Sequence, residues 1–128
     1  MKIRVEDNGD GTFTLLDRVD YFDPGAGLYI TVPAGFVTDY ASVPGPLQSF
    51  AGKIGRQNRA AILHDWLYHT RGIPRLGAIP DTLTRAECDR IFRDVMKADG
   101  VSWRLRWRMW LGVRLGGWAA WHFGERAA

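Results

Sequence analysis

The sequence predicts an α+β fold, with a small N-terminal antiparallel sheet followed by three helices, the last of them rich in tryptophan and arginine. Within residues 1–38, short alternating or β-branched runs are separated by turn signals. From residue 58 to residue 123, three longer runs have helical periodicity, and the irregular stretch 39–57 lies between the two parts. The length of 128 residues, with 46% hydrophobic and 24% charged residues, fits a single domain with one core.

The expected strands follow one another closely. Two alternating runs, residues 2–6 and 12–16, flank an NGDG turn, which predicts a hairpin. A third run, residues 19–22, ends at a DPG turn. The β-branched run LYITV at residues 28–32 is followed by a PAG turn that leads into residues 36–38. Together these runs predict the antiparallel sheet.

The first two helices have clear start and stop signals. Asn58 is the expected N-cap of the first helix, which the Arg71-Gly72 pair ends. The TRAE sequence at residues 84–87 is a capping box, and it predicts a second helix that continues to about Ala98. The glycine two residues later stops that helix.

Ser102 can cap the third helix, expected over residues 103–123, and the Gly116-Gly117 pair predicts a bend in it. Large side chains recur in it every three or four residues, with arginines between them: Trp103, Trp107, Trp110, Arg114 or Val113, Trp118 and Trp121. They could pack in the core with arginine stems covering the edges, or they could lie among lipid headgroups as an interfacial helix.

Charge and cysteine content limit the function classes. The net charge is +3, but residues 1–50 carry seven acidic against three basic residues, whereas residues 101–128 carry five arginines and one glutamate. The basic end favours an anionic partner, such as a lipid headgroup or a phosphate backbone, unless it is simply a solvated face. The single cysteine, Cys88, excludes an intramolecular disulfide and a cysteine-rich zinc site. The N-terminus is too polar for a signal peptide, and no run reaches the roughly 18 apolar residues of a spanning helix.

The most informative stretch is RAAILHDWLY at residues 59–68, which places a histidine and a carboxylate side by side on an apolar helix. His64 and Tyr68 share one helix face because they are four residues apart, and Asp65 points elsewhere. A His-Asp pair in apolar surroundings costs several kcal/mol to desolvate, so the fold must satisfy the pair or use it.

A histidine can act as a general base when an acceptor holds its far ring nitrogen. Asp65 points away and could instead bind a hard cation. Asp89, which lies on an otherwise apolar stripe of the second helix, is the candidate acceptor, and Tyr68 could donate to the same carboxylate. The residues therefore predict a base at His64 with Asp89 and Tyr68 as supports.

A purely structural interpretation of the same residues remains open. In it, the histidine bonds a backbone carbonyl and the neighbouring aspartate pairs with Arg59 or Arg85. Asp89 would then form an ion pair with Arg85 or Arg93 of its own helix.

HDWLY resembles the HDxxY signature of the phospholipase A2 superfamily, and RAECDRIF at residues 85–92 is similar to the compact phospholipase domain of parvovirus capsid proteins. The resemblance covers roughly residues 44–96. It implies that His64 activates water, that Asp65 binds calcium, and that Tyr68 and Asp89 hold the histidine. The glycine-rich calcium loop of that superfamily has no clean counterpart in residues 39–55.

A second resemblance spans most of the chain. VPAGFVTDYASVP at residues 32–44, the HDWLY helix and the basic tryptophan-rich tail are similar to a family of small tailed-phage and prophage proteins of unknown function. This resemblance implies that Asp39 belongs to the signature and lies near His64, as a further candidate metal ligand.

We therefore expect a phage or prophage accessory protein that hydrolyses an ester, with phospholipid as substrate and calcium as cofactor. The alternatives are a non-enzymatic virion or tail-associated structural protein, or another metal-dependent hydrolase acting on cell wall with Asp39 as a ligand. The expected partners are a phospholipid or membrane surface at the basic tryptophan-rich helix, and phage structural proteins. Nucleic acid is not expected, because no DNA- or RNA-binding motif occurs. The expected location is the host cytoplasm or the virion.

Overall fold

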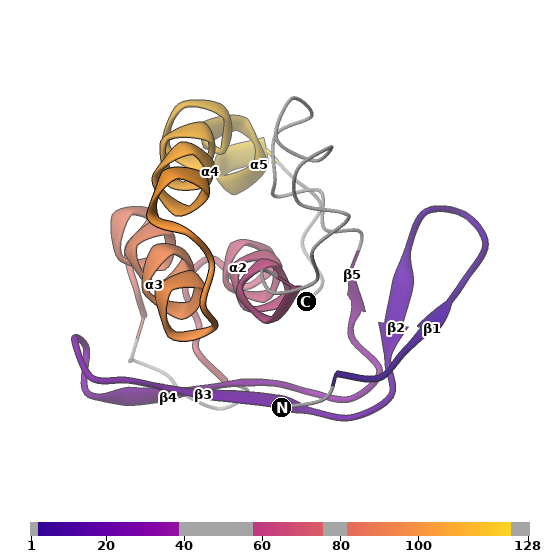
Figure 1. Cartoon of the computed structure of the whole chain (residues 1–128). Helices are drawn as coiled ribbons and strands as arrows, with labels where there is room; N and C mark the ends of the chain where they lie inside the picture. The colour runs from indigo at the N-terminus through magenta and orange to yellow at the C-terminus, as the bar shows by residue number, and fades with distance from the viewer. Residues whose placement is uncertain (1–2, 39–57, 76–81, 124–128) are drawn as a thin grey trace.

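The computed structural model describes residues 3–38, 58–75 and 82–123 of the chain. The described part is layered, with strands beneath and beside a central pair of helices and two further helices on top (Figure 1). The strands precede the helices in the chain, so the predicted α+β fold is confirmed.

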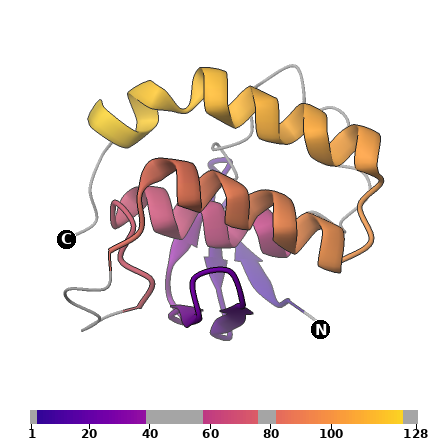
Figure 2. The same cartoon turned by 90° about the vertical axis from the view of Figure 1, so that its left-hand side faces the viewer.

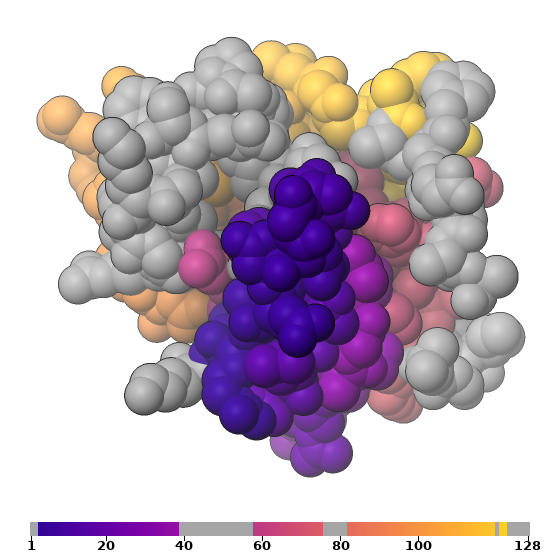
Figure 3. Space-filling model, turned by 90° about the vertical axis from the view of Figure 1, so that its right-hand side faces the viewer, coloured from indigo at the N-terminus to yellow at the C-terminus, as the bar shows by residue number. Residues whose placement is uncertain are grey.

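The described strands form two antiparallel sheets rather than one. The strand bounds are β1 (Val5–Asp7), β2 (Phe13–Leu15), β3 (Val19–Asp23), β4 (Leu28–Val32) and β5 (Val37–Thr38). The first sheet has the order β1-β2-β5, and β3 pairs with β4 in the second. Each predicted run therefore forms a strand, but β5 returns to pair with β2 and not with β4. Figure 3 shows this strand region in the middle of one face, with α5 and the end of α4 (yellow) behind it at the upper edge.

The central helix is α2 (Asn58–His69), and it is buried on every side. All nine residues from Ala60 to Tyr68 are buried, because α2 lies between the strands β4 and β5 and the helix α3 (Arg85–Ala98). A helix that is apolar all round is expected in such a position. The buried polar residues His64 and Asp65 are therefore the exceptions that need partners.

Local signals fix the start of α3 and the end of α2 as predicted, whereas Asn58, the expected N-cap of the first helix, is instead the first residue of α2. At α3, Thr84 accepts from the backbone of Glu87 while the Glu87 side chain accepts from the backbone of Thr84, which completes the capping box. After α2, Gly72 adopts a φ of 92°, and a Cβ there would overlap the carbonyl oxygen of Leu83. Only glycine can make this turn between the two helices.

The last predicted helix is divided by its glycines. It consists of α4 (Trp103–Gly116) and α5 (Trp118–Phe123), separated at Gly117, so the expected bend is confirmed. Figure 2 shows α3 returning alongside α2, with α4 and α5 crossing above both. Ser102 caps α4 by accepting from the backbone of Leu105.

The tryptophans of this helix contribute little to the core. Met109 and Val113 are the buried residues of α4, whereas Trp103, Trp107 and Trp118 are exposed. Packing of the tryptophan series as a whole in the core is therefore wrong. The smaller residues of α4 fill the space above α3. Of the tryptophans, Trp121 of α5 is partly buried against the core, with its ring centroid 5.1 Å from that of Tyr68.

Among the described residues, none of the helices has the length and apolar character needed to cross a membrane.

Candidate active site

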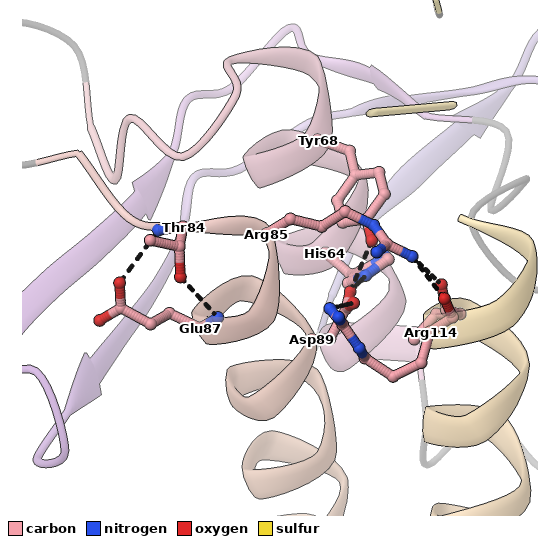
Figure 4. Close-up of polar contacts among 8 residues, drawn as sticks. His64, Tyr68, Thr84, Arg85, Glu87, Asp89 and Arg114 are labelled. Carbon is pink, nitrogen blue, oxygen red and sulfur yellow. Dashed lines mark hydrogen bonds and ion pairs between the residues drawn. The ribbon is translucent and has the colours of Figure 1, made fainter. Parts of the chain in front are cut away.

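The centre of the site is a direct contact between α2 and α3. His64 Nε2 lies 2.7 Å from Asp89 Oδ1, and both side chains are fully buried. His64 points from α2 toward α3 because α2 presents this face to its neighbour, and Asp89 occupies the facing stripe of α3 with Phe92 and Met96. Figure 4 shows the two side chains meeting between the helices.

Tyr68 joins the same carboxylate oxygen. Its hydroxyl donates to Asp89 Oδ1 at 2.7 Å, and its ring centroid lies 4.2 Å from that of His64. The ring of Phe92 packs against the imidazole as well, at 4.7 Å. The histidine ring is therefore held by one hydrogen bond and two aromatic contacts, as the helix spacing of His64 and Tyr68 indicated.

Arg114 on α4 is a partner that the sequence analysis missed. Its Nη1 donates to Asp89 Oδ2 at 2.8 Å, so the carboxylate binds a cation as well as the histidine and the tyrosine (Figure 4). Arg85 donates to the carbonyl oxygens of Val113 and Arg114, which fixes this end of α4. Helix spacing gave no signal for this contact, because Arg114 is one residue from Val113 and five from Met109 and so does not share the face of these two buried residues.

Gly117 leaves room for the tyrosine. A Cβ at Gly117 would lie 2.8 Å from the Tyr68 hydroxyl oxygen and would also overlap the carbonyl oxygen of Val113. The glycine that ends α4 thus has a second role, because it lets Tyr68 reach Asp89. Sequence analysis had assigned it only the bend.

The charges of the cluster follow from its contacts. Burial alone would raise the pKa of Asp89, but the hydrogen bond and charge of His64, with the bonds from Tyr68 and Arg114, hold this pKa below its ordinary value. Burial raises the pKa of Tyr68, and the bond to Asp89 adds to that effect. Asp89 is therefore ionised at neutral pH and Tyr68 is a protonated donor.

These protonation states define the orientation of the histidine. An ionised carboxylate can only accept, so Nε2 of His64 carries the hydrogen that faces Asp89. In the neutral ring, Nδ1 is then an acceptor. This Nδ1 is buried and has no hydrogen-bond partner among the described residues. An imidazole anchored on one nitrogen and unpartnered on the other has the arrangement of a general base.

Asp65 belongs to a separate set of contacts. Its Oδ2 accepts from the Thr38 hydroxyl of β5 at 2.6 Å, and its Oδ1 lies 3.3 Å from His69 Nε2. It points away from Asp89, as expected from its position on α2. The alternative pairings are not observed for it, since Arg59 binds Asp99 and Arg85 binds backbone carbonyls.

The structural alternative for Asp89 is also not observed. This carboxylate bonds His64, Tyr68 and Arg114 rather than Arg85 or Arg93 of its own helix. The guanidinium of Arg93 instead lies over the rings of Trp107 and Trp110.

The metal ligands expected from the sequence are only partly described. Asp39 lies outside the described residues. Within the described ranges, no three His, Cys, Asp or Glu side chains come together as a metal-binding group. Calcium takes six to eight oxygen ligands, and here the described residues offer the carboxylate of Asp65, with both oxygens already in contact with neighbours. These residues alone do not make a calcium site.

Comparisons with known proteins give a family but no activity. No curated protein and no solved structure matches the chain. The model of one protein family, described as a protein of unknown function (DUF1353), matches residues 13–113. That region includes the strands β2 to β5, the helices α2 and α3 with the His64–Asp89 contact, and α4 as far as Val113, whereas β1 lies outside it. The chain therefore belongs to the DUF1353 family.

Proposed function

We propose that this protein is a phospholipase A2-like hydrolase in which His64 activates a water molecule for attack on an ester, with phospholipid as the substrate. The observation that carries the proposal is the state of His64. Asp89 holds its Nε2 at 2.7 Å, while its Nδ1 has no partner among the described residues. A buried histidine in a purely structural role is expected to have both nitrogens bonded.

In the proposed reaction, Nδ1 of His64 accepts a proton from water as the water oxygen attacks the ester carbonyl carbon. Asp89 stabilises the imidazolium that forms, and Tyr68 and Arg114 keep the Asp89 carboxylate in place. When the tetrahedral intermediate collapses, the carbon–oxygen bond to the alcohol breaks. His64 then returns its proton to the departing alcohol oxygen, which leaves a carboxylic acid and a neutral histidine.

Calcium remains the proposed cofactor, with Asp65 and Asp39 as its candidate ligands. Bound there, it would act as a Lewis acid on the ester carbonyl. The carboxylate of Asp65 would have to exchange its contacts with Thr38 and His69 for the ion. The proton transfers proposed for His64 do not depend on this step.

The test is hydrolysis of vesicle phospholipid, followed as release of free fatty acid with calcium or with a chelator. We expect wild type to release fatty acid, and His64→Gln to lower the rate by about 10²-fold or more, the usual contribution of a general base. Asp23→Asn is the matched control, because Asp23 is equally buried but lies in the strand region. It should keep its activity wherever circular dichroism shows that it is folded.

The calcium part of the proposal has its own measurement. Calorimetric titration with calcium should show binding to wild type and loss of binding in Asp65→Asn. Hydrolysis that is insensitive to the chelator, with no calcium binding, would remove the ion from the proposal and leave the role of His64 in place. No release of fatty acid by folded wild type, with or without calcium, would contradict the hydrolase.

The second candidate is a non-enzymatic virion or tail-associated protein of a phage or prophage, located in the virion or the host cytoplasm. The complete burial of His64 and Asp89 favours it, because such a network can hold α2, α3 and α4 together without any substrate.

Another metal-dependent hydrolase, acting on cell wall, would need Asp39 beside His64. Release of soluble fragments from purified cell wall, abolished by Asp39→Asn, would favour that hydrolase.

A further inference from the structure

The last two helices present an apolar surface that the described chain does not cover. We call five side chains its outer face, and each is between 45% and 77% exposed: Trp103, Trp107, Leu111, Leu115 and Trp118. They are spaced four, four, four and three residues apart, so they lie on one side of α4 and α5. Figure 2 shows these helices at the edge of the molecule, with α2, α3 and the strands below them.

This surface is not left over from a lack of core positions. The opposite side of α4 packs through Met109 and Val113, which are fully buried. Large apolar side chains that gather on one exposed face are a recurrent sign of an interaction surface in soluble domains. The outer face is therefore a candidate interaction surface of the described part of the chain.

The charges around the outer face indicate which occupant it takes. The charged residues of α4 and α5 are four arginines, with no acidic residue, and Arg104 and Arg108 are exposed beside the tryptophans and leucines. Arg93 of α3 adds a further cation, with its guanidinium 4.4 Å from the ring centroid of Trp107. Tryptophan and arginine together suit the headgroup region of a bilayer, where rings lie at the interface and guanidinium groups meet phosphates.

We propose that the outer face docks on an anionic lipid bilayer. A second copy of the chain is the weaker occupant, because each outer face is flanked by arginines and by no acidic residue of α4 or α5, so two such faces placed together would repel each other. An anionic bilayer removes this repulsion and adds an attraction at each arginine. This inference goes beyond the proposed hydrolysis and does not depend on it.

Contacts between α4 and α3 hold the outer face in place before any partner binds. Arg114 binds Asp89, and Arg85 binds the carbonyl oxygens of Val113 and Arg114, so the end of α4 is already fixed to α3. A surface that is ordered before it binds loses less conformational entropy on binding. It also means that α4 joins the outer face to the carboxylate that holds His64.

The test is flotation of the full chain with vesicles of phosphatidylcholine alone, or of phosphatidylcholine mixed with phosphatidylglycerol. We expect binding to the mixed vesicles, weaker binding to the neutral ones, and loss of binding as salt is raised. The double change Leu111→Ser and Leu115→Ser should lower the partition coefficient about tenfold or more, because both side chains lose their burial in the interface. Arg104→Glu with Arg108→Glu should remove the preference for phosphatidylglycerol.

A matched control is available on the β3–β4 hairpin. Phe22 and Tyr29 are 46% and 60% exposed and their tilted rings contact each other, so Phe22→Ser with Tyr29→Ser removes a comparable exposed apolar area from another face. These changes should leave vesicle binding unchanged, and so should His64→Gln, which separates docking from hydrolysis.

Two results would overturn the proposal. One is that wild type does not bind the mixed vesicles, or that the variant with both leucines replaced binds them as well as wild type does. The other is a dimer in sedimentation velocity that the same leucine changes dissociate, which would assign the outer face to a second copy.

Discussion

Two carboxylates of this protein, Asp23 in the strand region and Asp89 in the helical region, are both fully buried, and both have a lowered pKa. Arg90 binds Asp23 through two parallel contacts of 3.0 and 2.8 Å, and the backbone N–H of Ala26 donates to it as well. Asp89 receives one guanidinium contact, from Arg114, and its other oxygen receives the histidine and the tyrosine.

The difference lies in the partners. A guanidinium remains charged at any working pH, so the Asp23–Arg90 contact can only join the β3–β4 hairpin to α3. An imidazole is a side chain that can accept a proton near neutral pH, and the second nitrogen of His64 faces away from the carboxylate. Burial and a lowered pKa are therefore shared by a structural and a candidate catalytic aspartate. What distinguishes them is the partner, because His64 has a second nitrogen without a hydrogen-bond partner among the described residues.

The largest expected effect comes from removing each carboxylate. Asp89→Ala should lower the free energy of unfolding by about 3–5 kcal/mol, the usual cost of breaking a buried pair, because it leaves His64, Tyr68 and Arg114 without their acceptor. Asp23→Ala should cost less, since Arg90 keeps its contact with Asp94 at 2.8 Å. Urea denaturation of both variants measures the difference, and an equal or reversed cost would contradict it.

A smaller effect is expected from Tyr68→Phe. The change removes one hydrogen bond to a charged acceptor, worth about 1.5–3 kcal/mol, while His64 and Arg114 still hold the carboxylate. Tyr29→Phe is the control, because Tyr29 is exposed and should show no change. A Tyr68→Phe variant as stable as wild type in urea would mean that the hydroxyl contributes nothing to the cluster.

The loss of stability at low pH is expected to be smaller than either of these effects, because protonation leaves each carboxyl group in place. The folded-state pKa values of Asp23 and Asp89 both lie below the ordinary value of 3.8, owing to Arg90 in one case and His64 in the other, against the opposing effect of burial. The stability that these groups contribute is present above that value and is lost as the pH falls through the lowered pKa values. Urea midpoints measured across this range should fall less steeply in Asp23→Asn and in Asp89→Asn than in wild type. An unchanged slope in Asp89→Asn would show that this carboxylate is not ionised in the folded protein.

Much of the fold was predictable because its signals are local. The capping box at Thr84 and Glu87 and the glycine turn at Gly72 each depend on residues next to them in the sequence. The pairing of β2 with β5 was not predictable, because nothing local chooses between partners for a two-residue strand.

The candidate site divides in the same way. His64 and Tyr68 share a helix face by spacing alone, and Asp89 was noticeable as a charge on an apolar stripe. Arg114 was missed because its contact with Asp89 depends on how α4 crosses α3, and no local sequence pattern predicts that crossing. The exposure of Trp103 and Trp107 depends on the same crossing, since it decides which side of α4 meets the core.

The smallest effect on stability is expected from changing a third aspartate, Asp17. This aspartate has contacts like those of Asp23 but is exposed, so comparing the two tests contact geometry against burial. Asp17 accepts from Arg4 through two contacts of 2.6 and 2.8 Å, a fork like that of Asp23 with Arg90. Both side chains are exposed, at 63% for Arg4 and 50% for Asp17, so water and salt screen the pair. Asp17→Asn should therefore leave the urea midpoint at the wild-type value, while Asp23→Asn lowers it. If the two variants shifted the midpoint equally, the fork itself would carry the stabilisation, and burial could not explain why Asp23 is structurally important.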